Sequence, residues 1–442
     1  CRLLPRHPNP ESKSLLMRSP SGDHEVTARW ERKRWLDFKN NLNKVSQSNQ
    51  FQREHFSALK SSGDWDSFDD FIRVCPFTTK DDLAKDREKN SPFGTNLTFS
   101  LSEYKKFNQT SGTQGIPMAW VDTMDDWRWM LGNWDRVLEA AQVSPGDRCF
   151  FAFSFGPFLG FWTAYEAASQ RGCVCIPAGG QSTEQRLHGI LNQRAEHLFC
   201  TPTYAMRLTS YAVEAGIDLS VHKLKSIIVA GETGGSLTEV RNRISAGWGN
   251  GIAVHDHYGM TEVGPVAYEI PGGQGGLRII LDSYYPEVVD PKNLDPVKDG
   301  DRGELVLTTL GRIGCPVFRY RTGDLVKAKR SNDENGLPAF DLEGGILGRT
   351  DDMVVVRGVN LYPSAVNSVM TRFPEIKEYQ VVFENRDSML EAKIKVECDQ
   401  EIRAVLEVAL QESFSLRIPV EIVASGSLPR HEMKAKRWIK LD

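Results

Sequence analysis

Apolar residues recur at three- and four-residue intervals between Trp127 and Ala141, which is the spacing that places them along one face of an α-helix. Thr123, with Asp126 three residues later, fits the capping box with which many helices begin. A Pro-Gly-Asp turn at residues 145–147 follows the last apolar position. The pattern therefore predicts an amphipathic helix between Thr123 and this turn.

Beyond that helix, short apolar segments alternate with segments of helical length. The apolar segments predict strands at Cys149–Phe153, Cys173–Ile176, His197–Cys200, Ser226–Ala230 and Ile252–His257. Such alternation is typical of an α/β fold with a largely parallel sheet. Ligands of these folds bind at the carboxyl ends of strands. Two polar segments, residues 231–232 and 258–262, directly follow predicted strands and are therefore candidates for a binding site.

The pattern changes in the last third of the chain. Residues 272–328 contain short apolar segments between Gly, Pro and Asp turns, which predicts a β-rich subdomain. From Asp352 the order is strand, helix, strand, strand, helix, strand, with Met353–Val356 as the first strand. This βαββαβ order suits a small split α/β sandwich. We predict a large α/β domain over residues 1–347, with an uncertain helical extension over 1–55, and a small α+β domain over 348–442.

Composition narrows the class of protein. A chain of 442 residues is too long for one core. A net charge of -4 argues against nucleic-acid binding through a broad basic face. No segment approaches the roughly 18 apolar residues of a membrane span, and the polar first twenty residues do not resemble a secretory signal. Eight scattered cysteines complete no zinc set, so we expect reduced thiols and a cytoplasmic location.

Residues 110–117, with the sequence TSGTQGIP, have the composition of a phosphate-binding loop. Their two glycines let the backbone approach an anion, and their three hydroxyls can donate to phosphate oxygens. The segment is not a Walker loop, because no Gly-Lys-Ser/Thr follows. The same residues are also typical of a polar surface turn. The candidate phosphate ligands are Thr110, Ser111, Gly112, Thr113 and Gly115.

Two further segments offer parts of a nucleotide site. Residues 258–262 (YGMTE) supply a ring that could stack on a base and the carboxylate of Glu262 for magnesium. Residues 320–324 (YRTGD) place Asp324 after a tight turn, where it could accept both ribose hydroxyls. A solvated glutamate and an ordinary β-turn are the alternatives. The basic segment over residues 428–437 would by itself be a solvated terminus.

The order of these motifs resembles the adenylate-forming superfamily of acyl-CoA synthetases, peptide-synthetase adenylation domains and luciferases. The motifs are TSGTxGxP, AGE, YGMTE, YRTGD, GRTDDM and a C-terminal lysine. Residues 75–83 (CPFTTKDDL), 176–180 (IPAGG) and 352–364 (DMVVVRGVNLYPS) are similar to the phenylacetate–CoA ligase family. The resemblance runs from about Phe56 to Leu441. It implies a ligase that uses ATP and Mg²⁺ to form an acyl-adenylate and then an acyl-CoA thioester.

The resemblance also implies roles for single residues. Lys434 would bridge the carboxylate and the α-phosphate, Glu262 would be associated with magnesium, and Arg349 would reach the ribose and phosphate. Asp351 would be the hinge of the small domain. The other expected nucleotide contacts, besides the loop, are Gly231, Glu232, Tyr258 as the adenine-stacking ring, Gly259, Thr261 and Asp324. Gln114 and Ile116 depart from the family pattern and leave the loop without a positive charge, so pyrophosphate would depend on other cations.

The motifs say less about the acid substrate and about the acceptor of its acyl group. Phe153, Phe155 and Phe158, with Gly179 and Ala230, predict an apolar pocket for an aryl or arylacetic acid, and ordinary core packing is the alternative. Two other activities stay open: a carboxylic-acid adenylating enzyme that loads a carrier protein or stops at the adenylate, and a non-catalytic nucleotide-binding homologue. The expected partners are a carboxylic acid, ATP and coenzyme A, without nucleic acid or membrane. A homodimer is left open.

Overall fold

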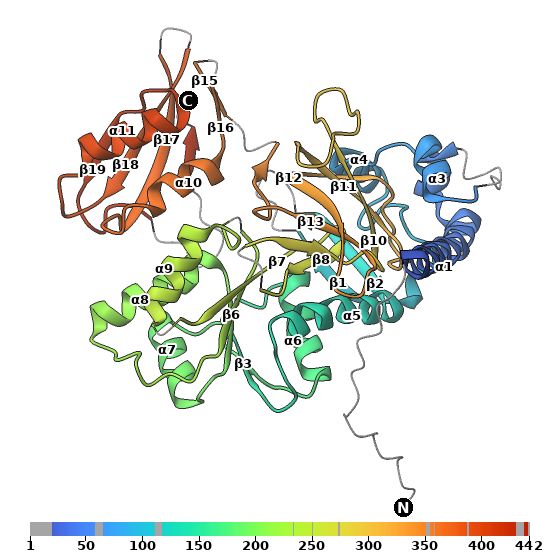
Figure 1. Cartoon of the computed structure of the whole chain (residues 1–442), viewed down its shortest axis with the longest axis horizontal. Coiled ribbons are helices and arrows are strands. Elements are labelled where there is room, and N and C mark those ends of the chain that lie inside the picture. Colours follow the sequence, from blue (N-terminus) through green and yellow to red (C-terminus); the bar gives the residue numbers. More distant parts are fainter. Residues whose placement is uncertain are drawn as a thin grey trace, which may run out of the picture.

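The computed structural model describes residues 20–57, 65–110, 117–232, 234–249, 251–272, 275–350, 354–357, 359–386, 389–429 and 437–440. A large domain carries a small domain at one end, next to α9 (Thr238–Trp248) (Figure 1). Among the described residues, no helix combines the length and the apolar character that crossing a membrane requires.

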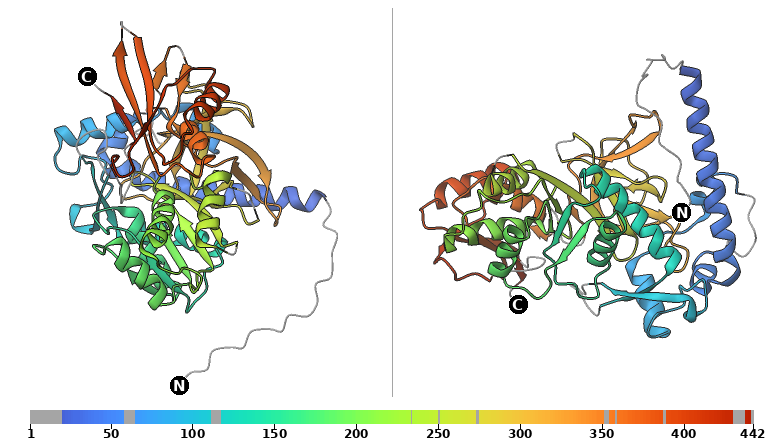
Figure 2. Two further views of the ribbon diagram at one scale, coloured as in Figure 1. Left: turned by 90° about the vertical axis from the view of Figure 1, so that its left-hand side faces the viewer. Right: turned by 90° about the horizontal axis from the view of Figure 1, so that it is seen from below.

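A long helix, α1 (Pro20–Ser48), lies along the side of the large domain that faces away from the small one (Figure 2). It is followed by α2 (Gln50–His55), α3 (Phe68–Val74) and α4 (Lys80–Lys89). The ring of Phe38 on α1 contacts the rings of Phe71 and Phe318, with centroids 5.1 and 5.9 Å apart. These aromatic contacts attach the N-terminal helices to the β-rich part of the large domain.

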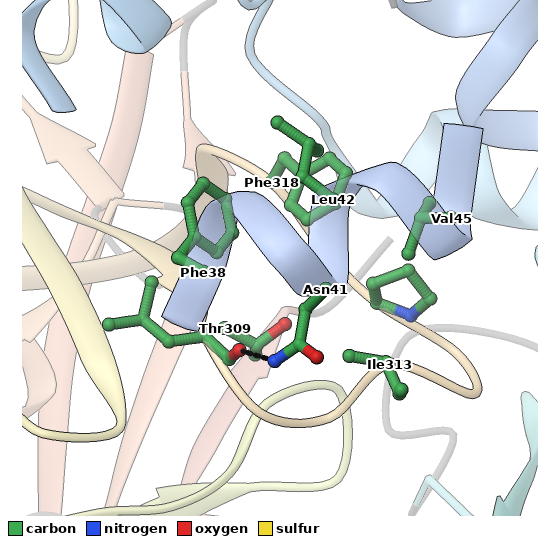
Figure 3. Close-up of a pocket in the computed structure, with 9 residues that line it drawn as sticks. Phe38, Asn41, Leu42, Val45, Thr309, Ile313 and Phe318 are labelled. Atoms are coloured by element: carbon green, nitrogen blue, oxygen red, sulfur yellow. Dashed lines mark hydrogen bonds between the residues drawn. The ribbon is translucent and has the colours of Figure 1, made fainter. Parts of the chain in front are cut away.

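A small cavity lies beneath α1 (Figure 3). It leaves no room for a water molecule, and its largely apolar lining includes Phe38, Leu42 and Phe318. Its polar member Asn41 already donates its side-chain amide to the carbonyl oxygen of Leu310 at 2.9 Å. A lining of this kind, with its amide satisfied, is a gap in packing and not a ligand site.

The large domain is built on a 12-stranded mixed sheet in the order β10-β11-β12-β13-β9-β8-β7-β6-β5-β3-β4, with β14 paired to β12. Its parallel half agrees with the predicted strands. It contains β3 (Arg148–Phe151), β4 (Val174–Pro177), β5 (His197–Cys200), β6 (Ser226–Val229) and β7 (Ala253–Met260). The helices between them are α6 (Leu159–Gln170), α7 (Thr183–Asn192), α8 (Pro202–Ala215) and α9. The predicted helix after Thr123 is α5 (Met124–Ala140).

Both faces of the parallel half are covered by helices, which explains why its inner strands β3, β5 and β6 are largely apolar. Successive side chains of a strand point to opposite faces. Phe150 and Leu198 therefore pack with α7, α8 and α9, whereas their neighbours Phe151 and Phe199 pack with α5 and α6. This three-layer α/β arrangement confirms the fold class.

The β-rich half continues the same sheet in antiparallel pairs. Its strands are β8 (Gly264–Glu269), β9 (Leu277–Ile279), β10 (Tyr284–Val289), β11 (Arg302–Thr309), β12 (Tyr320–Asn332), β13 (Pro338–Leu342) and β14 (Gly348–Arg349). A separate antiparallel pair is formed by β1 (Tyr104–Gln109) and β2 (Ala119–Thr123). The segment expected to bind phosphate connects these two strands.

The small domain contains the four-stranded sheet β19 (Val420–Val423), β18 (Met389–Glu397), β17 (Glu378–Arg386) and β20 (Trp438–Lys440). Its core also takes in residues of α10 (Pro363–Thr371) and α11 (Arg403–Phe414). The division into 1–347 and 348–442 stays a prediction, because β14 still pairs with β12 of the large sheet.

The predicted first strand of the βαββαβ order is present, but it does not belong to the four-stranded sheet. β15 (Val354–Val356) pairs with β16 (Val359–Leu361) in a separate hairpin. The chain reverses directly after Val356, where Arg357 has a left-handed φ of +50°, so the strand finds its partner locally. The edge beside β17 is occupied instead by β20, which runs parallel to it.

The capping box of α5 provides a test of this architecture. The hydroxyl of Thr123 donates to Asp126 Oδ2 at 2.7 Å and accepts from the Asp126 backbone N–H at 3.1 Å. Removing such a cap costs about 1 kcal/mol, and up to about 2. We expect Thr123→Ala to lower the free energy of unfolding by this amount in urea titrations. Thr123→Ser keeps the hydroxyl and should stay near wild type; equal losses in both variants would contradict the assigned cap.

Candidate active site

Three of the predicted residues meet at the end of β7. The hydroxyl of Tyr258 donates to Asp324 Oδ2 at 2.6 Å, and Arg349 Nη1 lies 3.3 Å from Asp324 Oδ1. Asp324 on β12 and Arg349 on β14 are directly opposite each other in the antiparallel pair, which accounts for their contact. Burial, followed by the negative charge of Asp324, raises the pKa of Tyr258 well above its usual range. The phenol therefore stays protonated and donates to the carboxylate.

Two glycines allow this close packing. A Cβ on Gly323, whose φ is +75°, would lie 2.9 Å from Arg349 Nη2. A Cβ on Gly259 would lie 2.8 Å from the carbonyl oxygen of Gly264, where the turn brings β8 back against β7. Any side chain at either position would push the neighbouring groups away. Gly259 thus has a backbone role, and its predicted nucleotide contact stays a prediction.

Glu262 lies in the turn between β7 and β8. Its side chain is 8% exposed, and its Oε1 is 3.8 Å from Lys80 Nζ at the start of α4. Among the described residues, no group of three or more His, Cys, Asp or Glu side chains is placed to hold a metal ion. A single buried carboxylate nevertheless fits Mg²⁺, which keeps several waters and is commonly held by one or two carboxylates plus phosphate oxygens.

Sequence reasoning missed the residues that support this turn. Arg312 Nη1 donates to the carbonyl oxygens of Thr261 at 2.7 Å and Glu262 at 3.0 Å. Its Nε and Nη2 bind the two carboxylate oxygens of Asp122 on β2 at 2.7 and 2.9 Å. Both side chains are 0% exposed. Burial opposes the charge of Arg312, but the attraction of Asp122 outweighs it and raises the pKa of the guanidinium.

No signal in the sequence could have singled out this pair. Arg312 follows a glycine between two strands, which is typical of an exposed turn, and Asp122 stands 190 positions away. Their contact arises only because the connection between β11 and β12 passes over β2. In the same connection, the backbone N–H groups of Ile313 and Gly314 donate to Asp126 Oδ1, in the first turn of α5, at 2.8 and 3.0 Å.

The expected phosphate loop is described only at its two ends. The Thr110 N–H donates to the Met118 carbonyl oxygen at 3.0 Å, and the Met118 N–H donates to Thr110 Oγ1 at 2.9 Å. The hydroxyl of Thr110 therefore closes the β1–β2 pair. Several predicted residues lie outside the described residues: Ser111, Gly112, Thr113, Gly115, the hinge Asp351 and the catalytic candidate Lys434.

Gly231 and Glu232 follow β6, as predicted. The Glu232 carboxylate accepts the backbone N–H of Thr203 at 2.7 Å and also its hydroxyl, at the first turn of α8. A negative charge is favourable there because helix N-termini carry partial positive charge. Ala230 is half-buried, and its N–H donates to the Cys200 carbonyl oxygen at 3.2 Å.

The predicted acyl-pocket residues other than Ala230 lie near α6. Phe153 stacks on Phe161 with centroids 4.1 Å apart, and Phe158 meets the same ring at 5.9 Å. A Cβ on Gly179 would lie 3.3 Å from the ring of Phe155. The structure thus places Phe153, Phe155, Phe158 and Gly179 in one aromatic neighbourhood, an arrangement that suits both an aryl pocket and core packing.

Comparisons with known proteins agree with this arrangement. Residues 107–311 match the family of AMP-binding enzymes, and residues 358–441 match the C-terminal domain of AMP-binding enzymes. The fold is therefore that of an adenylate-forming enzyme.

Curated relatives show the particular family. The chain is 31% identical to phenylacetate-coenzyme A ligase of Escherichia coli, over 84% of this chain and 85% of the relative. It is 33% identical to the enzyme of the same name from Thermus thermophilus, over 75% and 73%. The chain belongs to the phenylacetate–CoA ligase family.

Solved structures of 2-hydroxyisobutyryl-CoA ligase add information on conformation. The state after adenylation, in complex with an acyl-AMP, superposes with a TM-score of 0.83 at 26% identity, covering 91% of this chain and 88% of that one. The thioesterification state of the same enzyme, with acyl-AMP and coenzyme A, gives a TM-score of 0.68, covering 96% and 90%. The chain thus superposes more closely on the state after adenylation than on the thioesterification state.

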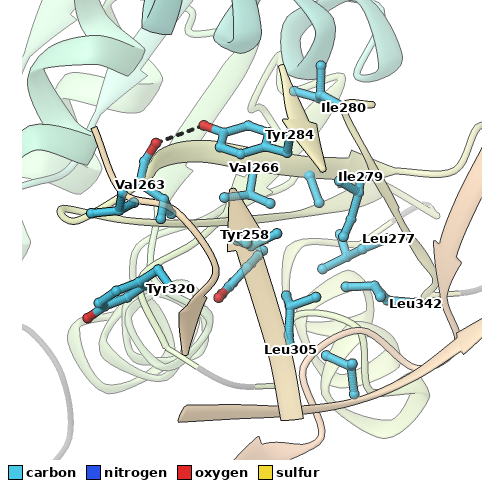
Figure 4. Close-up of a cluster of buried hydrophobic side chains, with 14 of the residues drawn as sticks. Tyr258, Val263, Val266, Leu277, Ile279, Ile280, Tyr284, Leu305, Tyr320 and Leu342 are labelled. Carbon is cyan, nitrogen blue, oxygen red and sulfur yellow. Dashed lines mark hydrogen bonds between the residues drawn. The ribbon is translucent and has the colours of Figure 1, made fainter. Parts of the chain in front are cut away.

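Two tyrosines in the core permit a matched test of the Tyr258–Asp324 contact (Figure 4). Tyr258 donates to a carboxylate, whereas Tyr284 donates to the carbonyl oxygen of Val263 at 2.9 Å. Hydrogen bonds to charged groups contribute about 1.5–3 kcal/mol and neutral ones about 1. We expect Tyr258→Phe to lower the free energy of unfolding more than Tyr284→Phe does, as measured by denaturant titration. Equal losses in the two variants would show that the hydrogen bond from Tyr258 to the Asp324 carboxylate stabilises the fold no more than the neutral bond of Tyr284 does.

Proposed function

We propose that this chain activates an aryl or arylacetic acid with ATP and transfers the acyl group to coenzyme A. The observation that carries the proposal is the contact of Tyr258, Asp324 and Arg349 at the end of β7. It provides a ring for a base, a carboxylate for ribose hydroxyls and a cation for phosphate in one place. The relatives named phenylacetate-coenzyme A ligase support both the reaction type and the class of acid.

In this proposal the nucleotide extends from Tyr258 toward the β1–β2 connection. The ring of Tyr258 stacks on adenine, Asp324 accepts from the ribose, and Arg349 binds ribose and phosphate. Residues 110–117 hold the β- and γ-phosphates, and Glu262 holds magnesium together with phosphate oxygens. Lys80, 3.8 Å from Glu262, supplies positive charge that Gln114 and Ile116 do not bring.

The reaction has two steps. A carboxylate oxygen of the acid attacks the α-phosphorus of ATP, and pyrophosphate leaves with the electrons of the broken P–O bond. The sulfur of coenzyme A then attacks the acyl carbon of the adenylate, and AMP leaves. Lys434 stabilises the charge that develops in the first step, and its withdrawal by rotation about Asp351 opens the site for the second. The similarity to the state after adenylation agrees with a structure poised between the two steps.

The acid would lie against Phe153, Phe155 and Phe158. Their rings offer apolar surface and edge-to-face contacts to an aromatic acid. Gly179 has no side chain, so the segment after β4 can approach Phe155 closely. A flat ring between these two segments is the shape this arrangement favours.

A cytoplasmic location and the domain division at residue 347 are further parts of this proposal, and a homodimer stays open. The first fifty-five residues, of which α1 and α2 are described, carry no residue of the proposed reaction.

The lysine assignment can be tested by separating the two half-reactions. We expect Lys434→Ala to reduce formation of the acyl-adenylate by on the order of 10²–10³, because one contact to the transition-state charge is lost. Conversion of supplied acyl-adenylate to the thioester should stay largely intact. Lys440→Ala, which removes an exposed lysine of the same terminal segment, is the matched control. Equal losses in both half-reactions would reject the assignment.

The substrate and acceptor can be tested together. We expect ATP–pyrophosphate exchange with aryl and arylacetic acids to exceed exchange with aliphatic and amino acids of similar size. Coenzyme A should be consumed in proportion to AMP released. Exchange without consumption of coenzyme A would indicate an adenylating enzyme with another acceptor, and absence of exchange would indicate a non-catalytic homologue.

A further inference from the structure

We propose that Arg312, held by Asp122, is a positioning residue that sets the orientation of Glu262 toward magnesium. The inference rests on the proposed function, in which Glu262 is the magnesium-associated acid. It extends that function to a residue pair that lies beneath the site and faces neither the nucleotide nor the acid.

The geometry explains how one side chain can orient another through the backbone. The carbonyl groups of Thr261 and Glu262 belong to the two peptide planes on either side of the Glu262 Cα. Arg312 Nη1 donates to both, at 2.7 and 3.0 Å. Because peptide groups are planar, fixing these two planes fixes both backbone dihedrals of Glu262. The direction of its Cα–Cβ bond, from which the carboxylate extends, is thereby set.

Asp122 fixes the guanidinium itself. It accepts from Nε and Nη2 in a bidentate arrangement at 2.7 and 2.9 Å, which leaves Nη1 directed at the turn. The ring of Trp120, two residues earlier on β2, lies beside the same guanidinium, with its centroid 5.0 Å from Cζ. A planar guanidinium can satisfy the carboxylate, the carbonyls and the ring at once, whereas an ammonium cannot.

The pair also connects two parts of the proposed phosphate site. Asp122 lies on β2, four residues after Met118, whose N–H closes the expected phosphate loop against Thr110. Arg312 therefore joins the strand that leaves this loop to the turn that carries Glu262. Strand β2 and the turn that carries the metal-associated acid are thus joined by an ion pair that is 0% exposed on both sides.

Stability alone does not account for such a pair. Buried ion pairs are often replaced by apolar residues of similar volume without loss of stability, because desolvation offsets the attraction between the charges. Arg278 and Asp341, which join β9 and β13, form a bidentate pair of the same kind at 2.7 and 2.9 Å that has no contact with Glu262. The two pairs together allow a positioning role to be separated from a structural one.

The test compares Arg312→Lys with the matched control Arg278→Lys. The probe is α,β-methylene-ATP, which cannot transfer its adenylyl group to an acid. It is titrated calorimetrically with magnesium and again with EDTA. Loss of a residue that orients a metal ligand typically weakens metal affinity 10–100-fold. We expect Arg312→Lys to raise the Kd of the magnesium complex on the order of 10-fold and to leave the metal-free Kd within about 2-fold. Arg278→Lys should change neither.

Two further measurements keep the inference testable if Arg312→Lys folds poorly. The double variant Asp122→Leu/Arg312→Met replaces the pair by apolar side chains and should fold. It should nevertheless show faster amide hydrogen exchange over residues 258–264 and the same loss of magnesium-dependent affinity. In a Glu262→Gln background, Arg312→Lys should add no further loss, because both changes act on one contact.

The inference is overturned if folded Arg312→Lys binds the magnesium complex like wild type, or if its effect adds fully to that of Glu262→Gln. A wild-type chain that binds the analogue equally with magnesium and with EDTA would instead reject the role of Glu262 in the proposed function. The two failures are thus told apart by the wild-type titration alone.

Discussion

The ion pair between Asp122 and Arg312 is the contact that fixes how three distant segments are arranged at the centre of this molecule. Both side chains are completely buried, so each charge is tolerable only because the other is present. The pair joins β2 to the connection between β11 and β12 and, through two carbonyls, to the turn after β7. Three segments far apart in sequence thus share one guanidinium.

The candidate site lies where the strand pairing of the large sheet changes from parallel to antiparallel. β7 runs parallel to β6 on one side and antiparallel to β8 on the other. The parallel half brings β7 to the edge where α/β sheets bind ligands, and the antiparallel half curls Asp324 and Arg349 back over it. A ring from one half and a carboxylate from the other therefore meet at a distance of 2.6 Å.

Patterns along the chain predicted the elements well where the deciding interactions are local. The capping box at Thr123 and the strands of the parallel half follow from spacing and apolar runs, because both faces of that sheet are covered. The small domain shows the limit of this reasoning. Its apolar segments were recognised, but the partner of β15 was not, because a strand of three residues can pair with any free edge.

The sequence by itself determined the family, the order of the motifs and the residue types at the proposed nucleotide site, since these depend on short segments with fixed spacing. Only the tertiary structure decided that Tyr258, Asp324 and Arg349 share a contact and that Arg312 is buried beneath Glu262. The physical reason is that burial of a charge depends on which distant segments cover it. From the sequence alone, an arginine in a Gly-Arg-Ile-Gly turn is expected to be solvated. In the folded chain, the segment that carries Asp122 covers it.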